Sequence, residues 1–252
     1  MKVNICGVKL DKFTLDEAVE SIVDHAFSGA APKYVVTPNA HHVLLLQKDA
    51  HFRKIYQNAL LVVPDGVPLV WASKLLGMSL PGRVNGTDLF ERLCEVASEK
   101  KLKVFLLGGR PEAANSAAVI LQKRHPNLKI VGTYCPPYGF ETDTAEMALI
   151  NTKVKAAAPH VLFVGLGAPK QEYWMHANYQ EIGVPISIGI GVSFELVSGM
   201  VTRAPRWMQK LGLEWFFRLI VEPRRLWKRY IIGNPSFLWL VFKQRLGLLH
   251  FE

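Results

Sequence analysis

The sequence lacks the features that mark several classes of protein. Its three cysteines, Cys6, Cys94 and Cys135, are too few and too far apart for a disulfide framework or a zinc site with CxxC spacing. The start, MKVNICGVKLDKF, carries charges and has no apolar segment of the kind found in a signal peptide. No run approaches the roughly 18 apolar residues of a membrane span. We therefore expect a chain that works in a reducing cytoplasm without a membrane span.

Several motifs for catalysis and for metal or cofactor binding are also missing. The sequence has no Asp-x-Asp pair for a metal-bridged diphosphate, no HExxH and no GxSxG. Gly108 and Gly109 have neither the spacing of a dinucleotide fingerprint nor the lysine of a Walker loop. His41 and His42 are adjacent, so their side chains are expected to point to opposite sides. We expect no metal site and no cofactor.

Positive charge is abundant, and most of it lies near the C-terminus. The net charge is +9. From Met200 onward ten basic and three acidic residues give +7, whereas 20 basic and 18 acidic residues before that point give +2. Tryptophan, phenylalanine and leucine are interleaved with the bases, a pattern typical of helices that lie on anionic lipid. We predict that residues 201–252 form a helical, basic, membrane-associating appendage, with helices over Val201–Val221 and Arg224–Leu249.

Residues 1–200 alternate short apolar segments with amphipathic ones. This alternation predicts an α/β catalytic domain with a Rossmann-like, mostly parallel sheet and helices on both faces. Segments such as VFLL and VLFV are apolar on both faces, as buried parallel strands are. The expected strands are Lys33–Thr37, Leu60–Val63, Lys103–Leu107, Lys129–Thr133, His160–Val164 and Pro185–Ile190. The expected helices are Thr14–Ser28, Ala40–Asn58, Thr87–Lys100, Glu112–Arg124, Thr144–Ala157 and Lys170–Gln180.

Polar or glycine-bearing residues follow five of the expected strands. Ligands of such folds bind at the carboxyl ends of the strands, so these residues are expected to meet at one site. They are Thr37-Pro38-Asn39, Pro64-Asp65-Gly66, Gly108-Gly109-Arg110, Ala168-Pro169-Lys170-Gln171 and Val192-Ser193-Phe194-Glu195.

The first of the candidate site residues have both a structural and a functional interpretation. Asp65 could cap a helix that begins near Val67, a position for which Asp is well suited. A carboxylate at a strand end, in a partly dry cleft, could instead act as a general base. Arg83 and Asn85 fit a turn and a helix cap, but an arginine there could equally hold a diphosphate or a carboxylate.

Two further segments leave the same choice open. Gly108 and Gly109, between a strand and a helix, fit a tight turn as well as an anion-binding loop at a helix N-terminus. Lys170 and Gln171 fit the polar first turn of a helix. Gln171 could also hydrogen-bond sugar hydroxyls, and Lys170 could bind a phosphate.

Read in order, these segments and the tail form a set of long motifs. They are Thr37-Pro38-Asn39, Pro64-Asp65-Gly66, Arg83-Val84-x-Gly86-x-Asp88, Gly165-x-Gly167-x-Pro169-Lys170-Gln171-Glu172-x-Trp174, Arg203-Ala204-Pro205 and Leu213-Glu214-Trp215-x-x-Arg218-Leu219-x-x-Glu222-Pro223-x-Arg225. The set resembles the WecG/TagA/CpsF glycosyltransferases from the N-terminus to about residue 232.

The resemblance implies an inverting, metal-independent enzyme that moves a sugar from a UDP-sugar to a polyprenyl-diphosphate-linked sugar. Such acceptors serve wall teichoic acid, common-antigen or exopolysaccharide synthesis at the inner face of the membrane. By motif position, Asp65 corresponds to the catalytic base, and Thr37, Asn39, Arg83 and Gln171 line the sugar pocket. Further substrate contacts are expected from Asn85, Gly108, Gly109 and Lys170.

The resemblance also gives the tail a part in the site. Arg218 and Arg225 match appendage arginines that close over the site of this family, and a third arginine position falls on Lys228, next to Arg229. Without a metal, such cations would stabilise the charge on departing UDP. Membrane docking and completion of the site are then expected to be one event. Glu195 stands where family members often have Asp, which leaves its role open.

Two other classes of protein are less well supported. A non-catalytic Rossmann nucleotide-binding protein would need the spaced glycines and an acidic ribose partner. A nucleic-acid binder could use interleaved bases and aromatics, but here the bases lie among too many bulky apolar residues, so no nucleic-acid partner is expected. The donor sugar stays open between N-acetylmannosamine, its uronic acid and glucose, all used in the family. The acceptor, and whether the chain forms a homo-oligomer, also stay open.

Overall fold

The computed structural model describes residues 2–251, apart from the side chain of Lys210. Residue contacts divide the chain into two compact units. The first comprises Met1–Thr14, Thr37–Asn85 and Thr202–Glu252, and the second comprises Leu15–Val36 and Gly86–Val201. The division into a catalytic domain of residues 1–200 and an appendage of residues 201–252 that completes the site stays a prediction.

The second unit is built on a parallel sheet. The main sheet has the strand order β4-β3-β8-β7-β5-β6, and its last five strands belong to this unit. They are β3 (Lys33–Val36), β8 (Ile186–Gly189), β7 (Val161–Gly165), β5 (Lys103–Gly108) and β6 (Lys129–Tyr134), and each neighbouring pair among them is parallel. Every residue of β7 and β8 is buried, which explains why these strands are apolar without alternation.

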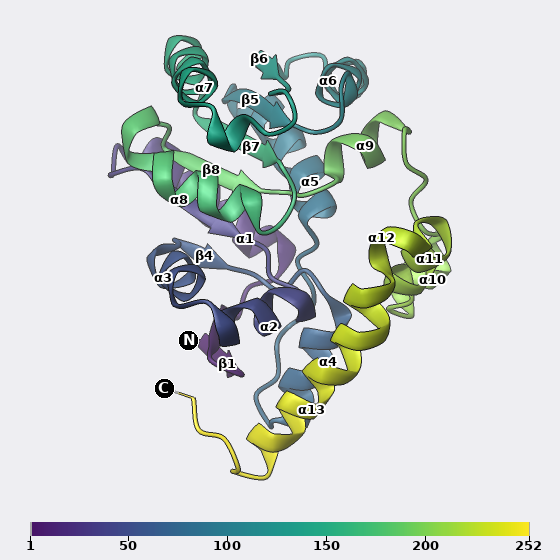
Figure 1. Ribbon diagram of the computed structural model, residues 1–252. Coiled ribbons are helices and arrows are strands. Elements are labelled where there is room, and N and C mark those ends of the chain that lie inside the picture. The colour runs from purple at the N-terminus through teal and green to yellow at the C-terminus, as the bar shows by residue number, and fades with distance from the viewer. Residues whose placement is uncertain (1, 252) are drawn as a thin grey trace. The chain divides into compact units, whose positions relative to one another are not determined.

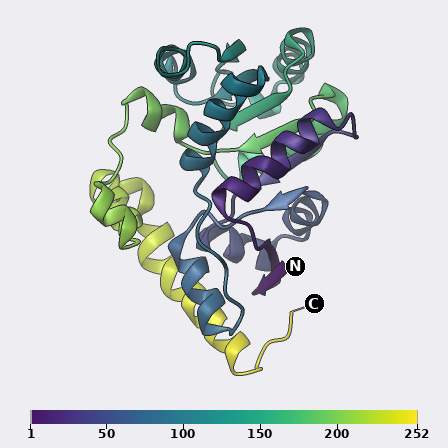
Figure 2. The same cartoon turned by 180° about the vertical axis from the view of Figure 1, so that it is seen from behind.

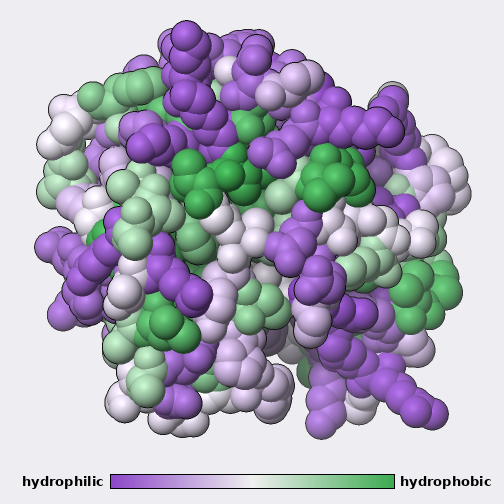
Figure 3. All heavy atoms as spheres, turned by 90° about the horizontal axis from the view of Figure 1, so that it is seen from above, coloured by the Kyte–Doolittle hydropathy of each residue, from purple (hydrophilic) through white to green (hydrophobic). Residues whose placement is uncertain are grey.

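Helices cover both faces of this sheet (Figures 1 and 2), as the sequence predicts for a Rossmann-like fold. One face carries α1 (Leu15–Phe27), α5 (Gly86–Lys100) and α6 (Ala113–Arg124), and the other carries α7 (Thr144–Ala157) and α8 (Lys170–Ile182). A 3-10 turn, η1 (Phe140–Thr142), follows β6, and α9 (Ser193–Ser198) follows β8. The outer surface over α6 and α7 is mostly hydrophilic, with small separate hydrophobic areas (Figure 3).

The first unit combines an N-terminal hairpin, the segment around β4 and the tail. Its elements are β1 (Lys2–Ile5), β2 (Val8–Asp11), α2 (Ala40–Lys48), α3 (Ala50–Asn58), β4 (Leu61–Val62), α4 (Val67–Leu75), α10 (Arg206–Lys210), α11 (Glu214–Val221), α12 (Pro223–Trp227), a π-helical turn η2 (Lys228–Ile232) and α13 (Gly233–Arg245). The antiparallel hairpin of β1 and β2 was not among the expected strands. Asp11 links it to β4, because its Oδ2 accepts a hydrogen bond from the Val62 N–H at 2.9 Å.

The last helix, α13, packs on α2 and α4 within this unit. Its buried residues Gly233, Phe237 and Val241 recur every fourth position and therefore lie along one side of the helix. Near its end, Gln244 Oε1 accepts a hydrogen bond from the Cys6 N–H at 2.7 Å, which ties the tail to the N-terminal hairpin. Among residues 2–251, none of the helices combines the length and the apolar character needed to cross a membrane.

The prediction of one helix over Ala40–Asn58 was wrong. The helix is interrupted at Asp49, whose backbone is extended (φ −125°, ψ 106°). Asp49 ends α2 and caps α3, because its Oδ1 accepts a hydrogen bond from the Phe52 N–H at 2.9 Å. Asp favours such caps since its short side chain competes for backbone groups.

The prediction of one helix over Val201–Val221 was also wrong. The segment contains α10 and α11, with Gly212 between them in the left-handed region (φ +73°). A Cβ at this position would lie 2.7 Å from Val67 Cγ1, so the turn needs glycine for space as well as for conformation. The break before Pro223 was predicted correctly, and a continuous helical stretch follows it to Arg245.

Candidate active site

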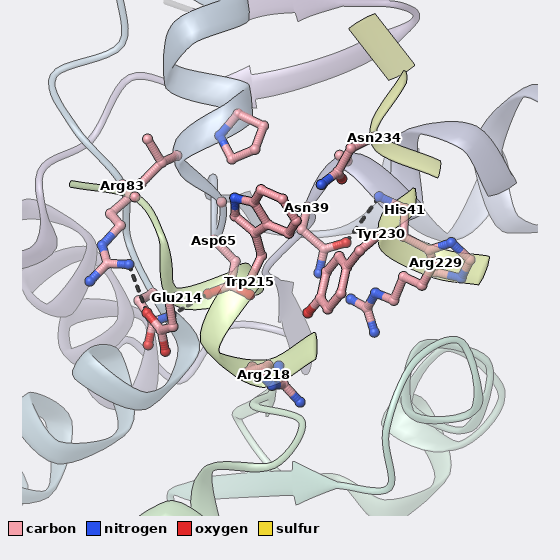
Figure 4. Close-up of a pocket in the computed structure, with 16 residues that line it drawn as sticks. Asn39, His41, Asp65, Arg83, Glu214, Trp215, Arg218, Arg229, Tyr230 and Asn234 are labelled. Atoms are coloured by element: carbon pink, nitrogen blue, oxygen red, sulfur yellow. Dashed lines mark hydrogen bonds and ion pairs between the residues drawn. The ribbon is translucent and has the colours of Figure 1, made fainter. Parts of the chain in front are cut away.

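A cavity of about 90 Å³ lies within the first unit, at the start of α2 and α4 and beside the tail. It brings together five of the predicted site residues, which are Asn39, Asp65, Arg83, Asn85 and Arg218. The tail also supplies Glu214, Trp215, Arg229, Tyr230 and Asn234. Figure 4 shows Asp65 and Trp215 near the centre of this group, with Arg83 and Glu214 to one side and Arg229 and His41 to the other.

Asp65 follows β4, and hydrogen bonds hold both its backbone and its side chain. Its N–H donates to the Pro38 carbonyl at 2.8 Å, which joins the loop after β4 to the start of α2. Its Oδ1 accepts from Asn85 Nδ2 at 2.8 Å. The residue that caps α4 is Gly66, which makes no side-chain cap bond, so the interpretation of Asp65 as the cap was wrong. The Asp65 side chain instead lines the cavity.

Asn39 sits at the N-terminus of α2 and forms a reciprocal cap with the first turn. Its Oδ1 accepts from the His41 N–H at 3.1 Å, and its own N–H donates to His42 Nδ1 at 3.0 Å. This pair of bonds satisfies backbone donors that a helix start leaves open. It also fixes Asn39 at the cavity wall, within the same unit as Asp65.

Arg83 is joined to the tail by an ion pair. Its Nη1 lies 2.9 Å from Oε2 of Glu214, the first residue of α11. Both side chains are largely shielded from water, with 20% and 17% of their surface exposed. The pair therefore connects the loop before α5 with the first turn of α11 at the edge of the cavity.

Arg229 lines the cavity from the π-helical turn η2. Its Nε is buried and has no hydrogen-bond partner among residues 2–251. Burial lowers the pKa of the guanidinium, and the nearby charges of Arg218 and Arg225 act in the same direction, whereas Tyr230 and Asp65 raise it. The Arg229 side chain is half-buried with a buried Nε beside other cations, so an anion would stabilise it and this part of the cavity is suited to bind one.

The positive charge of Arg229 also affects the pKa of His41. Burial, followed by the charge of Arg229 and the neighbouring His42, lowers the pKa of His41 to about 4. The imidazole is therefore neutral near pH 7 and can act as a hydrogen-bond donor or acceptor without adding charge.

Two aromatic rings of the tail form part of the wall. The ring centroids of Trp215 and Tyr230 are 5.8 Å apart, and the planes are inclined by 55°. Both residues line the cavity (Figure 4). The sequence pattern predicts that the tail aromatics face a lipid surface. Their pairing across α11 and η2 could not be read from spacing, because a helix break at Glu222 and the start of the π-helical turn at Lys228 lie between them.

Three predicted residues of the first unit lie elsewhere. Thr37 is buried at the end of β3 and is not part of the cavity wall. Arg225 is mostly exposed and pairs with Glu222. Lys228 is exposed, with its Nζ 5.6 Å from the centroid of the Trp227 ring, and its neighbour Arg229 lines the cavity instead. A π-helical turn begins at Lys228 and changes the spacing of side chains around the helix. Counting α-helical turns from Arg218 therefore does not predict which side chain lines the cavity.

The remaining predicted site residues belong to the second unit, and they are Gly108, Gly109, Lys170 and Gln171. Gly108 and Gly109 have φ of +100° and +82°, and a Cβ on Gly108 would lie 2.9 Å from the Gly165 carbonyl, so a larger residue does not fit. Gly109 lines a second cavity of about 630 Å³ between the loops after β5 and β6. Contact of this loop with substrate stays a prediction.

Gln171 and Lys170 begin α8 in the same unit. Gln171 is buried; its Oε1 accepts from the Gly191 N–H at 3.0 Å and its Nε2 donates to Glu172 Oε1 at 2.8 Å. Lys170 pairs with Glu141. Both side chains therefore have protein partners, and their proposed contacts with sugar and phosphate stay predictions.

Glu195, whose role the sequence left open, is buried in the second unit. Its Oε1 accepts from the Arg110 N–H at 2.9 Å, and its Oε2 has no hydrogen-bond partner among residues 2–251. The described part of the chain contains no group of three or more His, Cys, Asp or Glu side chains arranged to hold a metal ion.

Comparisons with known proteins agree on one family. Residues 3–250 match the family described as "Glycosyl transferase WecG/TagA/CpsF family". The chain is 32% identical over 236 residues to the N-acetylglucosaminyldiphosphoundecaprenol N-acetyl-beta-D-mannosaminyltransferase of Bacillus subtilis, covering 93% of this chain and 84% of the relative. It is 29% identical over 245 residues to the protein of the same name from Staphylococcus aureus, covering 97% and 93% of the two chains.

Proposed function

This chain belongs to the WecG/TagA/CpsF glycosyltransferase family, and we propose that it moves N-acetylmannosamine from a UDP-sugar to a polyprenyl-diphosphate-linked N-acetylglucosamine. The names of the Bacillus and Staphylococcus relatives support this donor sugar and this acceptor. At about 30% identity, glucose and N-acetylmannosaminuronic acid remain the alternative donor sugars within the family.

One observation carries the proposal. A carboxylate, Asp65, is oriented by Asn85 in the same cavity that holds the guanidinium groups of Arg218 and Arg229. Sugar transfer from a nucleoside diphosphate needs both kinds of group: a base for the acceptor hydroxyl and positive charge for the departing diphosphate. The cavity supplies both from one unit of the chain.

In this mechanism, Asp65 accepts the proton of the acceptor hydroxyl as the hydroxyl oxygen attacks the anomeric carbon. The new carbon–oxygen bond forms on the face opposite the diphosphate, the bond from the anomeric carbon to the phosphate oxygen breaks, and UDP leaves with its electron pair. A single displacement of this kind inverts the anomeric configuration. Asn85 donates a hydrogen bond to Oδ1 of Asp65 and so orients the carboxylate that accepts this proton.

Arg218 and Arg229 are assigned to the negative charge of the diphosphate. Charge-assisted hydrogen bonds from guanidinium groups are about twice as strong as neutral ones and match phosphate geometry. The buried, unpartnered Nε of Arg229 gives this residue a donor that a phosphate oxygen could satisfy. Since these cations can stabilise the leaving group, the reaction is proposed to need no metal ion.

The tail is proposed to hold the enzyme at the inner face of the cell membrane. Large hydrophobic side chains are exposed along it, including Trp207, Phe216, Ile220, Trp227 and Trp239. Bases lie among these side chains, and each base near an anionic surface contributes about 1 kcal/mol of attraction. The same segment lines the cavity through Trp215, Arg218 and Arg229, so attachment to lipid and assembly of the site are proposed to be coupled.

A donor screen tests this function. Purified protein is incubated with a short-chain lipid-linked N-acetylglucosamine and, in separate reactions, UDP-N-acetylmannosamine, UDP-N-acetylmannosaminuronic acid or UDP-glucose, and the release of UDP and the elongated lipid are measured. The proposal expects N-acetylmannosamine to be transferred fastest. Faster transfer of glucose or of N-acetylmannosaminuronic acid would assign that sugar as the donor in place of N-acetylmannosamine. A lipid that is elongated with none of the three sugars would contradict the proposed reaction.

A further inference from the structure

Two helices of the first unit expose hydrophobic residues in rows that begin at the cavity. On α4, Val67 lines the cavity, and Trp71 and Leu75 follow it at intervals of four residues on the same side. These two side chains are 51% and 52% exposed, although α4 belongs to the body of the unit and not to the tail. Exposed apolar side chains that lie next to one another, unlike single ones, mark a surface that binds a ligand, a partner or a membrane.

The second row lies on α13. Asn234 lines the cavity, and Leu238 and Phe242 follow at the same four-residue interval, 54% and 47% exposed. They do not belong to the stripe of Gly233, Phe237 and Val241, through which α13 is buried. The exposed row is therefore additional to the residues that hold the helix in place.

The two rows run in the same direction. Helices α4 and α13 contact each other, and Figures 1 and 2 show them side by side, both leading away from the loops that form the cavity. At about 1.5 Å per residue, the α4 row extends roughly 12 Å from Val67 to Leu75, and the α13 row covers a similar length from Asn234 to Phe242.

We propose that the apolar chain of the lipid-linked acceptor lies along these four side chains, Trp71, Leu75, Leu238 and Phe242, which we call the acceptor track. The proposal rests on the proposed function, which places the sugar hydroxyl of the lipid-linked acceptor beside Asp65 in the cavity, so that the apolar chain leads out of the cavity. An apolar chain that leaves a polar cavity would otherwise face water, at a cost of about 0.8 kcal/mol per exposed methylene. The two rows offer apolar surface from the point where the chain must emerge.

The other occupant of such a surface would be the bilayer itself. A helix that lies on anionic lipid usually carries many Lys and Arg residues. Helix α4 carries one basic residue, Lys74, among nine, and α13 carries two, Lys243 and Arg245, both in its last turn. The composition of α4 therefore favours an uncharged ligand, the polyprenyl chain, over a charged membrane surface.

Binding of two soluble probes tests the track without relying on sugar transfer. Isothermal titration compares farnesyl diphosphate, below the concentration at which it aggregates, with inorganic pyrophosphate, which has the charge but no chain. The variants are Trp71→Gln/Leu75→Gln and Leu238→Gln/Phe242→Gln. Glutamine is a good helix former, so these surface changes should preserve the fold. The matched control is Val119→Gln/Leu149→Gln, which alters two exposed hydrophobic residues of the second unit.

The track predicts that the wild-type protein binds farnesyl diphosphate at least about tenfold more tightly than pyrophosphate, from burial of apolar surface. Each track variant should lose most of this ratio while keeping its affinity for pyrophosphate, and the control should keep both. An unchanged ratio in the track variants, or no preference in the wild type, would overturn the proposal.

Co-sedimentation with phosphatidylglycerol vesicles distinguishes the bilayer. Loss of vesicle binding in the track variants with an unchanged farnesyl ratio would assign the rows to the membrane and overturn the acceptor track. The proposed function is judged separately by sugar transfer. A wild-type protein that shows the farnesyl preference but transfers no sugar would contradict the proposed function and leave the track standing.

Discussion

The guanidinium of Arg83 and the carboxylate of Glu214 are joined by an ion pair with an Nη1–Oε2 distance of 2.9 Å. The two residues lie 131 positions apart in the chain. Arg83 precedes α5, and Glu214 opens α11 of the tail, so the pair connects the tail to the loop that also carries Asn85, the partner of Asp65. The tail therefore acts on the cavity by direct contact, in addition to its expected attraction to lipid.

This pair should be energetically coupled in catalysis. We expect Glu214→Gln to lower kcat/KM by about tenfold, because Arg83 loses the charge that fixes it. In a double-mutant cycle with Arg83→Gln, the coupling should be about 1–2 kcal/mol, within the range for residues in direct contact. Glu91→Gln, which breaks the exposed pair with Arg124 in the second unit, is the control and should change kcat/KM little. Additive losses at positions 83 and 214 would show that the pair has no role in the site.

Arg229 should matter more than Lys228. Removal of one donor to a developing anion typically lowers kcat by 10² to 10³, and we expect Arg229→Ala to fall near the lower end of that range. Lys228 is exposed and should tolerate alanine with less than about a threefold loss. Steady-state UDP release measures both. A greater loss at Lys228 than at Arg229 would contradict the assignment of the π-turn arginine to the diphosphate.

The protonation of His41 gives a test of the positive field in the cavity. Burial and the charge of Arg229 lower its pKa to about 4, below the value of about 6.5 expected in the unfolded chain. The protonated form is therefore disfavoured in the folded state, and this group contributes stability above pH 6.5 that is lost as the pH falls toward 4. An NMR titration should show the His41 midpoint near 4 and a rise in Arg229→Ala. A midpoint near 6.5 in the intact protein would show that the field is absent.

Transfer should survive chelation. Since Arg218 and Arg229 can stabilise the departing diphosphate, we expect incubation with excess EDTA and dialysis to leave turnover within about twofold of the untreated enzyme. Magnesium and manganese are then added back to each sample. Abolished turnover that either ion restores would require a metal-bound mechanism in place of the arginine-based one.

The sequence predicted the sheet, its helices and the family, because these depend on periodicity and on contiguous motifs. Strands such as β7 are apolar throughout since both faces are buried, and that signal is local. The interruptions at Asp49 and Gly212 were not predicted, because the amphipathic pattern continues across both residues. Whether one capping or left-handed residue ends a helix depends on its contacts in the folded chain, which the local sequence does not show. Gly212 in particular depends on Val67, a residue far away in the chain.

The site residues that come from strand ends were predicted, whereas most of those that come from the tail were missed. Asn39 and Asp65 reach the cavity from the ends of expected strands. Glu214 was quoted only as part of a motif, because nothing in the spacing indicates that it pairs with Arg83. Arg229 was passed over in favour of Lys228, since the π-helical turn that begins at Lys228 changes the register and has no sequence signature.

The central claim is that Asp65 is the base, and its most direct test is the rate of a single turnover by Asp65→Asn. Asparagine keeps the size of the side chain and a hydrogen-bond acceptor for Asn85, but it cannot take up the proton of the acceptor hydroxyl. With donor and acceptor saturating, and with thermal unfolding and UDP binding unchanged from the wild type, the account predicts that sugar transfer falls by roughly 10² to 10⁴. A folded Asp65→Asn protein that transfers sugar at close to the wild-type rate would contradict it.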